Sequence, residues 1–346
     1  MKPTRVFLLL ATAAAFAACA ERAAVDPAAE EQYQQGMAVY LEGGEANLRQ
    51  AIEHFTQAVE IDTTFARGYA GLSRAYAAIG GNYNILAPEE SWPQAKSAAD
   101  RALALDEDLA DAHLAHAYVL EGRDWDWAGA DMAYQRALEL DSTNAEILLG
   151  YAWFLYGTGR LDDASVMLAQ AGALEPSAGD PFLRFVVTGD ADEAIDAANA
   201  LIASTPDNPY GYWVLALIQT WEGDYAAAAQ ALQQQIPLMD GDVVDEVALL
   251  GFVYGRMGQE ANARGMLQRL DRVAAAGRYV SPVLKGWIYS GLGDRDSALL
   301  WVQRGYEVQA HRSGLGLRIF GALFEPIRDD PRFSRMLEEM GLLAQR

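Results

Sequence analysis

Residues 144–176 read NAEILLGYAWFLYGTGRLDDASVMLAQAGALEP, and this stretch decides the fold. Its second half carries a small residue, a bulky residue four positions later and another small residue three further on: Ala164, Leu168 and Ala171. This spacing places the three side chains on one face of a helix. Gly159 stands five residues before the triplet, where a first helix must stop and the chain must reverse. The stretch therefore predicts two helices joined by a tight turn.

The same triplet recurs eight times along the chain. The opening residues are 44, 35, 34, 30, 34, 35 and 35 positions apart, and a fixed period of this length is typical of a solenoid. A solenoid has one continuous core, so the repeat favours a single extended body over the two domains that 346 residues would suggest. The triplets are Ala51-Phe55-Ala58, Ala95-Ala99-Ala102, Ala130-Tyr134-Ala137, Ala164-Leu168-Ala171, Ala194-Ala198-Leu201, Ala228-Leu232-Gln235, Ala263-Leu267-Leu270 and Ala298-Val302-Gly305.

Two further series run in phase with the triplets. Small residues stand twelve positions before the opening alanine in four units, where they allow the two helix axes of a unit to approach closely. These residues are Ala152, Ala216, Gly251 and Gly286. Glycines stand five positions before it in five successive units. These are Gly159, Gly189, Gly223, Gly258 and Gly293. Long alternating runs rich in Val and Ile are lacking, so we expect almost no sheet.

Two units depart from the period. The spacing of 44 residues places an insertion around Gly80–Gln94. The spacing of 30 residues means that the first helix of the fifth unit, near Phe182–Val187, has lost about one turn. A deletion of four residues keeps the helical face nearly in phase, so the stack survives it with a kink.

The pattern resembles that of tetratricopeptide repeats over roughly residues 33–310. The resemblance implies an all-α fold, a right-handed α-solenoid of about eight helix pairs with a C-terminal capping helix. Within this family, the sequence most resembles the repeats attached to bacterial winged-helix regulators, adenylate cyclases and serine/threonine kinases. The segments that carry this likeness are ARGYAGLSRAYAAIG (66–80), RDWDWAGADMAYQRALELDSTNAE (123–146) and FEPIRDDPRFSRMLEEMGL (324–342).

The C-terminal segment, residues 311–346, is predicted to cap the solenoid. Asp330 followed by Pro331 is a helix cap with a first-turn proline. An apolar stripe follows that would cover the exposed face of the last repeat. Its members are Phe333, Met336, Leu337 and Met340.

The charge of the chain excludes one class of partner. Acidic residues number 48 against 26 basic ones, which gives a formal net charge of −22. Phosphate contacts need clustered Lys and Arg side chains, and the sequence contains no such cluster. We therefore expect no nucleic-acid partner.

The N-terminus resembles a bacterial lipoprotein signal. A short basic start with Lys2 and Arg5 precedes 13 apolar residues, 6–18, which are too few to span a bilayer. Cys19, the only cysteine, follows them directly. The resemblance implies a signal peptide over residues 1–18, a lipid on Cys19, and a tether over residues 19–32. It favours an outer-membrane lipoprotein facing the periplasm; the alternative is an ordinary signal peptide and a secreted or periplasmic protein without lipid.

Candidate chemical groups are sparse. His113 and His116 lie three apart and could share a helix face for a metal, but no third ligand has convincing spacing, and packed histidines explain the pair better. The run Asp124-Trp125-Asp126-Trp127 is interpreted as a turn and helix start with packed Trp side chains. No nucleophile motif, phosphate loop or dinucleotide fingerprint appears. We therefore expect no enzyme, no metal and no cofactor.

The resemblance also implies a binding groove, because first helices line the concave face of tetratricopeptide solenoids. Aromatic side chains there would supply large contact areas to a peptide or protein partner, although the same residues could instead pack between repeats. The predicted function is a protein-interaction scaffold. Its rivals are an assembly factor of a secretion or export complex that uses the convex face, and a ligand sensor or enzyme. The groove residues are Tyr118, Trp153, Tyr156, Tyr210, Trp213, Trp221, Phe252, Arg256 and Trp287.

Overall fold

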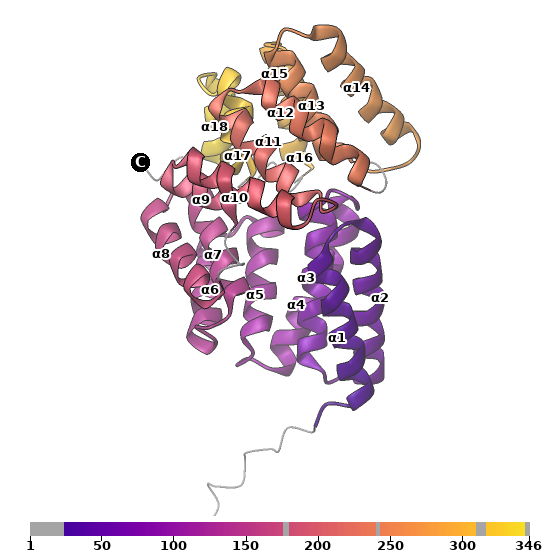
Figure 1. Cartoon of the computed structure of the whole chain (residues 1–346). Helices are drawn as coiled ribbons and strands as arrows, with labels where there is room; N and C mark the ends of the chain where they lie inside the picture. The colour runs from indigo at the N-terminus through magenta and orange to yellow at the C-terminus, as the bar shows by residue number, and fades with distance from the viewer. Residues whose placement is uncertain (1–23, 176–179, 240–242, 309–315, 343–346) are drawn as a thin grey trace, which may run out of the picture.

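The computed structural model describes residues 24–175, 180–239, 243–308 and 316–342; Cys19 and the expected signal peptide lie outside them. The described residues form helices and no strand (Figure 1). Eight consecutive helix pairs build an α-solenoid, which confirms the predicted fold class. The pairs are α1 (Pro27–Glu42) with α2 (Glu45–Ile61), α3 (Ala66–Ala77) with α4 (Pro88–Leu105), α5 (Ala110–Val119) with α6 (Trp127–Leu140), α7 (Ala145–Thr158) with α8 (Leu161–Leu174), α9 (Pro181–Thr188) with α10 (Ala191–Ser204), α11 (Tyr210–Glu222) with α12 (Tyr225–Gln235), α13 (Val244–Arg256) with α14 (Glu260–Ala275), and α15 (Pro282–Gly291) with α16 (Arg295–Glu307).

The repeated triplets form the spine of the core. Phe55 and Tyr134, the largest members, are both 0 % exposed, and only Leu201 among the triplets is half-buried rather than buried. Burying an aromatic side chain of this size removes a large apolar area from water, and truncating it to Ala costs about 3–5 kcal/mol. The period found in the sequence is thus the period of the core.

The in-phase glycines act as predicted. Gly159 ends α7 with φ 88°, in the left-handed region that glycine enters without a steric penalty, and the equivalent glycines of the next four pairs share this conformation. The small residues on the first helices allow close packing within a pair: a Cβ on Gly251 of α13 would lie 2.9 Å from the Met266 Cβ of α14. Both series therefore have the structural roles expected of them.

Two irregular units are found where the spacing places them. Helix α9 has only eight residues, which confirms the shortened first helix of the fifth unit. The insertion after Gly80 lengthens two elements: α3 continues into a π-helix, η1 (Ala78–Asn82), and α4 begins at Pro88, well before its triplet. Trp92 from this extension is buried and packs against Gly122 of the next pair.

One boundary differs from the sequence prediction. Helix α1 begins at Pro27, capped by the Asp26 carboxylate, rather than at residue 33. Ala29 is fully buried, so these residues belong to the first pair and the expected tether is shorter than residues 19–32. The small polar composition of the segment obscured a capped helix start.

The chain ends in α17 (Gly316–Ile319), a 3₁₀-helix η6 (Gly321–Ile327) and α18 (Pro331–Glu339). Asp330 caps α18, and Phe333, Met336 and Met340 are buried, as the capping role requires. Helix α18 packs on α16, the last helix of the final pair. The cap also reaches back to the third pair, which the sequence does not indicate.

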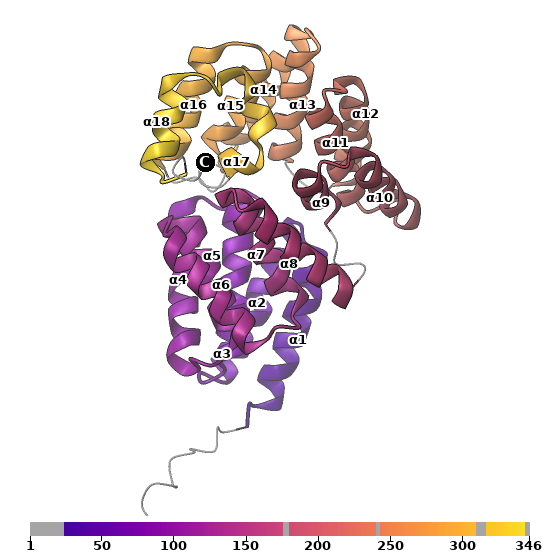
Figure 2. The same cartoon turned by 90° about the vertical axis from the view of Figure 1, so that its left-hand side faces the viewer.

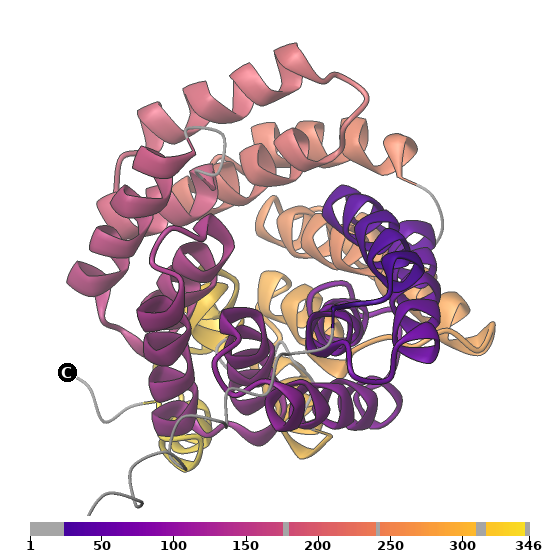
Figure 3. The ribbon, with the colours of Figure 1, turned by 90° about the horizontal axis from the view of Figure 1, so that it is seen from below.

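The solenoid curves so that its second half, α9–α18, stacks on its first half, α1–α8 (Figures 1 and 2). Seen from below, the helix pairs follow a path that turns back on itself (Figure 3). The side-chain amide of Asn84 donates to Asp245 of α13 at 3.2 and 3.3 Å. Trp125 stacks on Tyr306 of α16, with ring centroids 5.6 Å apart. These contacts join turns of the second and third pairs to the seventh and eighth.

Two more contacts cross the same junction. Glu45 at the start of α2 pairs with Arg278 beyond α14 at 2.6 Å. The indole nitrogen of Trp127 donates to the backbone oxygen of Met340 at 2.6 Å. We call the four pairs Glu45–Arg278, Asn84–Asp245, Trp125–Tyr306 and Trp127–Met340 the closure contacts.

Candidate partner-binding surface

The inner side of the first half is filled by a cluster around Arg74 of α3. This side chain is 2 % exposed and is ion-paired with Glu146 of α7 and, at 4.0 Å, with Asp111 of α5. Its guanidinium lies 5.2 Å from the ring centre of Tyr40 of α1. Four successive first helices thus converge on one cation, and the space between them is filled by their own side chains.

The electrostatics of the cluster follow from its burial. Burial opposes the charge of Arg74, but Glu146, Tyr40 and Asp111 outweigh this effect and raise its pKa above the ordinary value. Burial raises the pKa of Tyr40 to about 12 and that of Tyr118 well above its ordinary value. Arg74 is therefore a permanently charged group whose terminal nitrogens face the two carboxylates. Tyr118, predicted for the groove, belongs to this cluster.

A half-buried acid lies one turn beyond the cluster. Glu121, in the π-helix η2 (Leu120–Asp124), accepts a hydrogen bond from the hydroxyl of Tyr134 at 2.9 Å. Burial raises the pKa of Glu121 to about 8, and the hydrogen bond from Tyr134 only partly opposes this. This carboxyl is therefore protonated at neutral pH, a state that needs no partner cation.

Aromatic side chains continue along the first helices α7, α9 and α11. The Phe182 ring lies 6.0 Å from Trp153 and 5.7 Å from Trp221, between centroids, and Tyr156 and Phe185 flank the two tryptophans. We call the half-buried rings Trp153, Tyr156 and Trp221, together with the buried Phe182 and Phe185 that support them, the aromatic strip. The sequence prediction missed the two phenylalanines, although their spacing of three in the shortened helix is a signal that could have found them.

The aromatic strip borders a polar group. Asp180 caps α9 by accepting from the backbone N–H groups of Phe182 and Leu183, and burial raises its pKa. Tyr210 is 42 % exposed, but its phenolic end lies beside Asp180, and desolvation and this carboxylate raise the pKa of Tyr210 well above its ordinary value. A partner at the aromatic strip would therefore meet both apolar rings and an acidic edge.

The remaining predicted residues separate into two groups. Trp213 of α11 is half-buried against the core, one turn after Tyr210 on the same helix. Arg256 is exposed at the end of α13, where its guanidinium lies 5.3 Å from the Tyr225 ring and 3.4 Å from Glu325. The structure therefore brings Trp153, Tyr156, Tyr210, Trp213 and Trp221 into one region but leaves Arg256 apart from it.

Two of the predicted groove residues are corrected. Phe252 and Trp287 stand eleven residues before their opening alanines, as Trp153 does, but are 1 % and 0 % exposed. The capping segment covers this side of the last pair, since Phe320 packs on Trp287 with centroids 5.4 Å apart. Both side chains belong to the core and offer no surface to a partner.

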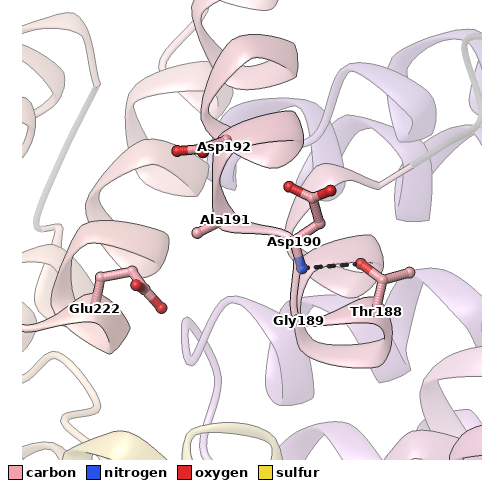
Figure 4. A pocket seen from close by; sticks show the side chains of 6 residues that line it. All are labelled: Thr188, Gly189, Asp190, Ala191, Asp192 and Glu222. Atoms are coloured by element: carbon pink, nitrogen blue, oxygen red, sulfur yellow. Dashed lines mark hydrogen bonds between the residues drawn. The ribbon is translucent and has the colours of Figure 1, made fainter.

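A shallow hollow of about 480 Å³ lies between the ends of α9 and α11 (Figure 4). Its polar lining consists of Thr188, Asp190, Asp192 and Glu222, and the Thr188 hydroxyl accepts from the Asp190 backbone N–H at 3.2 Å. These carboxylates are exposed, and the Thr188 hydroxyl donates to the backbone oxygen of Arg184 at 2.9 Å. The arrangement has no catalytic geometry.

The other candidate groups have structural partners. A ring nitrogen of His113 is hydrogen-bonded to the backbone oxygen of Glu107 at 2.8 Å. His116 is half-buried, and desolvation lowers its pKa. Within the described ranges, no three His, Cys, Asp or Glu side chains are placed to hold a metal ion. Asp126 caps α6, and Trp125 and Trp127 are packed at the closure contacts, which confirms the interpretation of the Asp124–Trp127 run.

Comparison with known proteins agrees with this architecture. Residues 126–180 match the tetratricopeptide-repeat family model. Together with the eight helix pairs, this match supports a tetratricopeptide-repeat protein, and no catalytic family is indicated. No curated protein matches the sequence. Among the described residues, no helix has the length and apolar character needed to cross a bilayer.

Several solved structures share the fold at low identity. Human IFIT1 in its dimer with m7Gppp-AAAA aligns with a TM-score of 0.58 and 17 % identity, over 89 % of this chain and 71 % of that one. Yeast Tom70 gives 0.51 and 16 %, over 92 % and 69 %. The APC/C hetero-tetramer Cut9–Hcn1 gives 0.56 and 13 %, over 89 % and 55 %. At these identities the likeness shows the fold alone.

Proposed function

We propose that this protein is a non-enzymatic scaffold that binds a peptide or protein partner through the partly exposed rings of the aromatic strip and the neighbouring Trp213. The observation that carries the proposal is the row of half-buried rings on α7 and α11: Trp153, Tyr156, Trp213 and Trp221. Large rings that are partly exposed and already fixed by packing offer contact area at a small cost in conformational entropy. The inner side of the first half, filled by the Arg74 cluster, offers no comparable surface.

The acidic edge beside the aromatic strip defines the partner further. Asp180 caps the start of α9 beside the strip, Asp190 and Glu222 lie where α9 and α11 end, and the whole chain is strongly acidic. A partner segment that combines apolar side chains with Lys or Arg would complement both features. A nucleic acid would meet repulsion instead.

Attachment to the bacterial envelope is the second part of the proposal. The apolar N-terminal segment that ends at Cys19 supports cleavage before this cysteine and lipid attachment to it, with the solenoid facing the periplasm. A Cys19→Ser variant would test this. Wild type should carry the mass of a lipid and partition into detergent, whereas the variant should do neither; identical masses and partitioning would refute the anchor.

The binding role is tested by capture from native membranes. A Trp153→Ala/Trp213→Ala variant removes two rings of the proposed surface. Trp301→Ala is a matched control, because Trp301 is also half-buried but lies on the second helix α16. Circular dichroism establishes that all three proteins are folded. We expect a partner that wild type and the control retain and the double variant loses; equal capture by all three would direct attention to the outer face and a role in assembly.

A further inference from the structure

Two of the four closure contacts, Asn84–Asp245 and Trp125–Tyr306, come from the only turns among the described residues in which a residue other than glycine has positive φ. Asn84 has φ 49° and Trp125 has φ 51°, whereas the corresponding turns of the later pairs use glycine. This conformation costs free energy for any residue with a side chain, and it persists where surrounding contacts determine it. Here the contacts that do so are made by the second half of the chain.

The same two side chains are incompletely satisfied in the closed arrangement. Asn84 is 2 % exposed, yet its Oδ1 has no hydrogen-bond partner, and the buried indole nitrogen of Trp125 has none either. Buried polar atoms without partners oppose the state that buries them, because water would satisfy them on exposure. The closed arrangement thus carries two costs, the positive φ of these turns and the two buried polar atoms without partners. Opening would let water bind those two atoms.

Charge distribution adds an attraction that depends on salt. Residues 24–175 contain 25 acidic and 8 basic residues, whereas residues 256–342 contain 13 basic and 10 acidic ones. Closure brings these two segments together, and the Glu45–Arg278 pair is one direct contact between them. An attraction between partly exposed charges weakens as ionic strength rises.

Closure also covers one end of the aromatic strip. The Arg318 guanidinium of α17 lies against Gly159 at the end of α7, where an added Cβ would meet its Nη2 at 2.6 Å. Tyr156, one turn earlier, lies close enough to Arg318 and Arg328 for both cations to lower its pKa, although burial raises it to about 12. The C-terminal segment therefore sits beside the ring that a partner would use.

We infer that the closure contacts form a clasp that opens reversibly, and that the closed form limits access to the Tyr156 end of the aromatic strip. Opening separates α17 and α18 from α6 and α7 while each helix pair stays folded. The inference goes beyond partner binding, and it is tested on the protein alone, so that its failure would leave the scaffold proposal standing.

A donor–acceptor exchange tests the clasp. Asn84→Asp places two carboxylates within about one hydrogen-bond length of each other and should open the protein. Adding Asp245→Asn to the same chain restores a donor opposite a carboxylate with the positions exchanged, and should close it again. Asp245→Asn alone reports the other interactions of that residue. Asn262→Asp on the exposed face of α14 makes the same charge change away from the junction.

The measurements are the radius of gyration in solution and hydrogen–deuterium exchange of residues 153–160 and 331–342. We expect Asn84→Asp to increase the radius and to accelerate exchange in both segments at least fivefold, with an unchanged circular dichroism spectrum. The double variant and Asn262→Asp should resemble wild type, and high salt should shift wild type toward the open form.

The inference is overturned if folded Asn84→Asp keeps the radius and exchange of wild type, or if the double variant fails to reverse its effect. Should Asn84→Asp not fold, Asn84→Gly replaces it, since glycine removes the contact and tolerates the positive φ. Unchanged exchange in that variant would also overturn the inference.

Discussion

Asn84 and Asp245 are 161 residues apart in the chain, yet the amide of the first donates to both carboxylate oxygens of the second, at 3.2 and 3.3 Å. The contact ties the second helix pair to the seventh, although repeats in a solenoid normally touch only their neighbours. It arises because the curvature of successive pairs returns the chain to its own beginning. The contact between the two halves of the solenoid therefore depends on residues that lie outside the repeat pattern.

Arg74 should contribute far more to stability than its neighbour on the same helix. Arg74→Ala leaves Glu146 and Asp111 without their buried cation, and breaking a buried ion pair typically costs about 3–5 kcal/mol. Arg67→Ala is the matched control, because the Arg67–Glu30 pair is 40 % and 33 % exposed and should cost at most about 1 kcal/mol. Urea unfolding of both variants measures the difference. Equal losses would mean that the cluster around Arg74 is not the organising feature of the first half.

Glu121 should make the protein less stable as the pH rises. Its folded pKa, about 8, lies above the ordinary value of 4.5, so between these values the folded state binds more protons than the unfolded state. The stabilisation is complete below the unfolded pKa and is lost as the pH rises toward 8, with a slope of at most about 1.4 kcal/mol per pH unit. Glu121→Gln removes the titration and keeps an acceptor for Tyr134. Across pH 5, 6.5 and 8, the unfolding free energy of wild type should fall relative to that of Glu121→Gln. If the two proteins show the same dependence on pH, the assignment is contradicted.

Two Gly→Ala substitutions in one helix pair should act in opposite directions. On Gly255 of α13, an added Cβ would lie 2.5 Å from the backbone carbon of Gly291, and the resulting overpacking should cost about 1–3 kcal/mol. On Gly265 of α14, the Cβ would meet nothing within 4 Å, so the better helix propensity of Ala should stabilise the protein by up to about 1 kcal/mol. Thermal unfolding distinguishes the two signs. Destabilisation by Gly265→Ala would show that α14 packs against a surface not seen here.

Trp127→Phe should loosen the capping helix without unfolding the solenoid. The substitution removes the indole donor to the Met340 backbone oxygen, a loss of about 1 kcal/mol, and keeps most of the apolar contact. Hydrogen exchange should accelerate in residues 331–342 and stay unchanged in α1–α4. Trp301→Phe is the control, since that ring faces Lys285 and Arg304 instead. Equal acceleration in both variants would rule out the hydrogen bond as the cause.

The fold could be predicted because its determinants are local and repeated. A buried triplet such as Ala130-Tyr134-Ala137 and a turn glycine such as Gly159 each act within one helix pair, so periodicity alone reveals them. The helix start at Pro27 was missed because a single capping aspartate, Asp26, outweighed a composition typical of a tether.

The candidate site could be predicted only in part. Trp153, Phe252 and Trp287 occupy the same position in their repeats, but the capping segment and the glycine-mediated approach of α13 to α15 bury the last two. Those effects depend on what packs on a repeat from elsewhere in the chain. The closure contacts were missed for the same reason, since the summed curvature of many pairs cannot be derived from the spacing of one.

The return of the chain to its beginning also changes how its energy is shared among repeats. A linear stack frays from its two ends, because each terminal repeat has one neighbour and melts independently of the middle. In this protein Arg278 and Met340 bond to Glu45 and Trp127, so the late repeats stabilise the early ones directly. Neither end of the solenoid is then free, and unfolding of any one repeat destabilises the repeats on both sides of it. Such an arrangement replaces gradual fraying with a single cooperative transition.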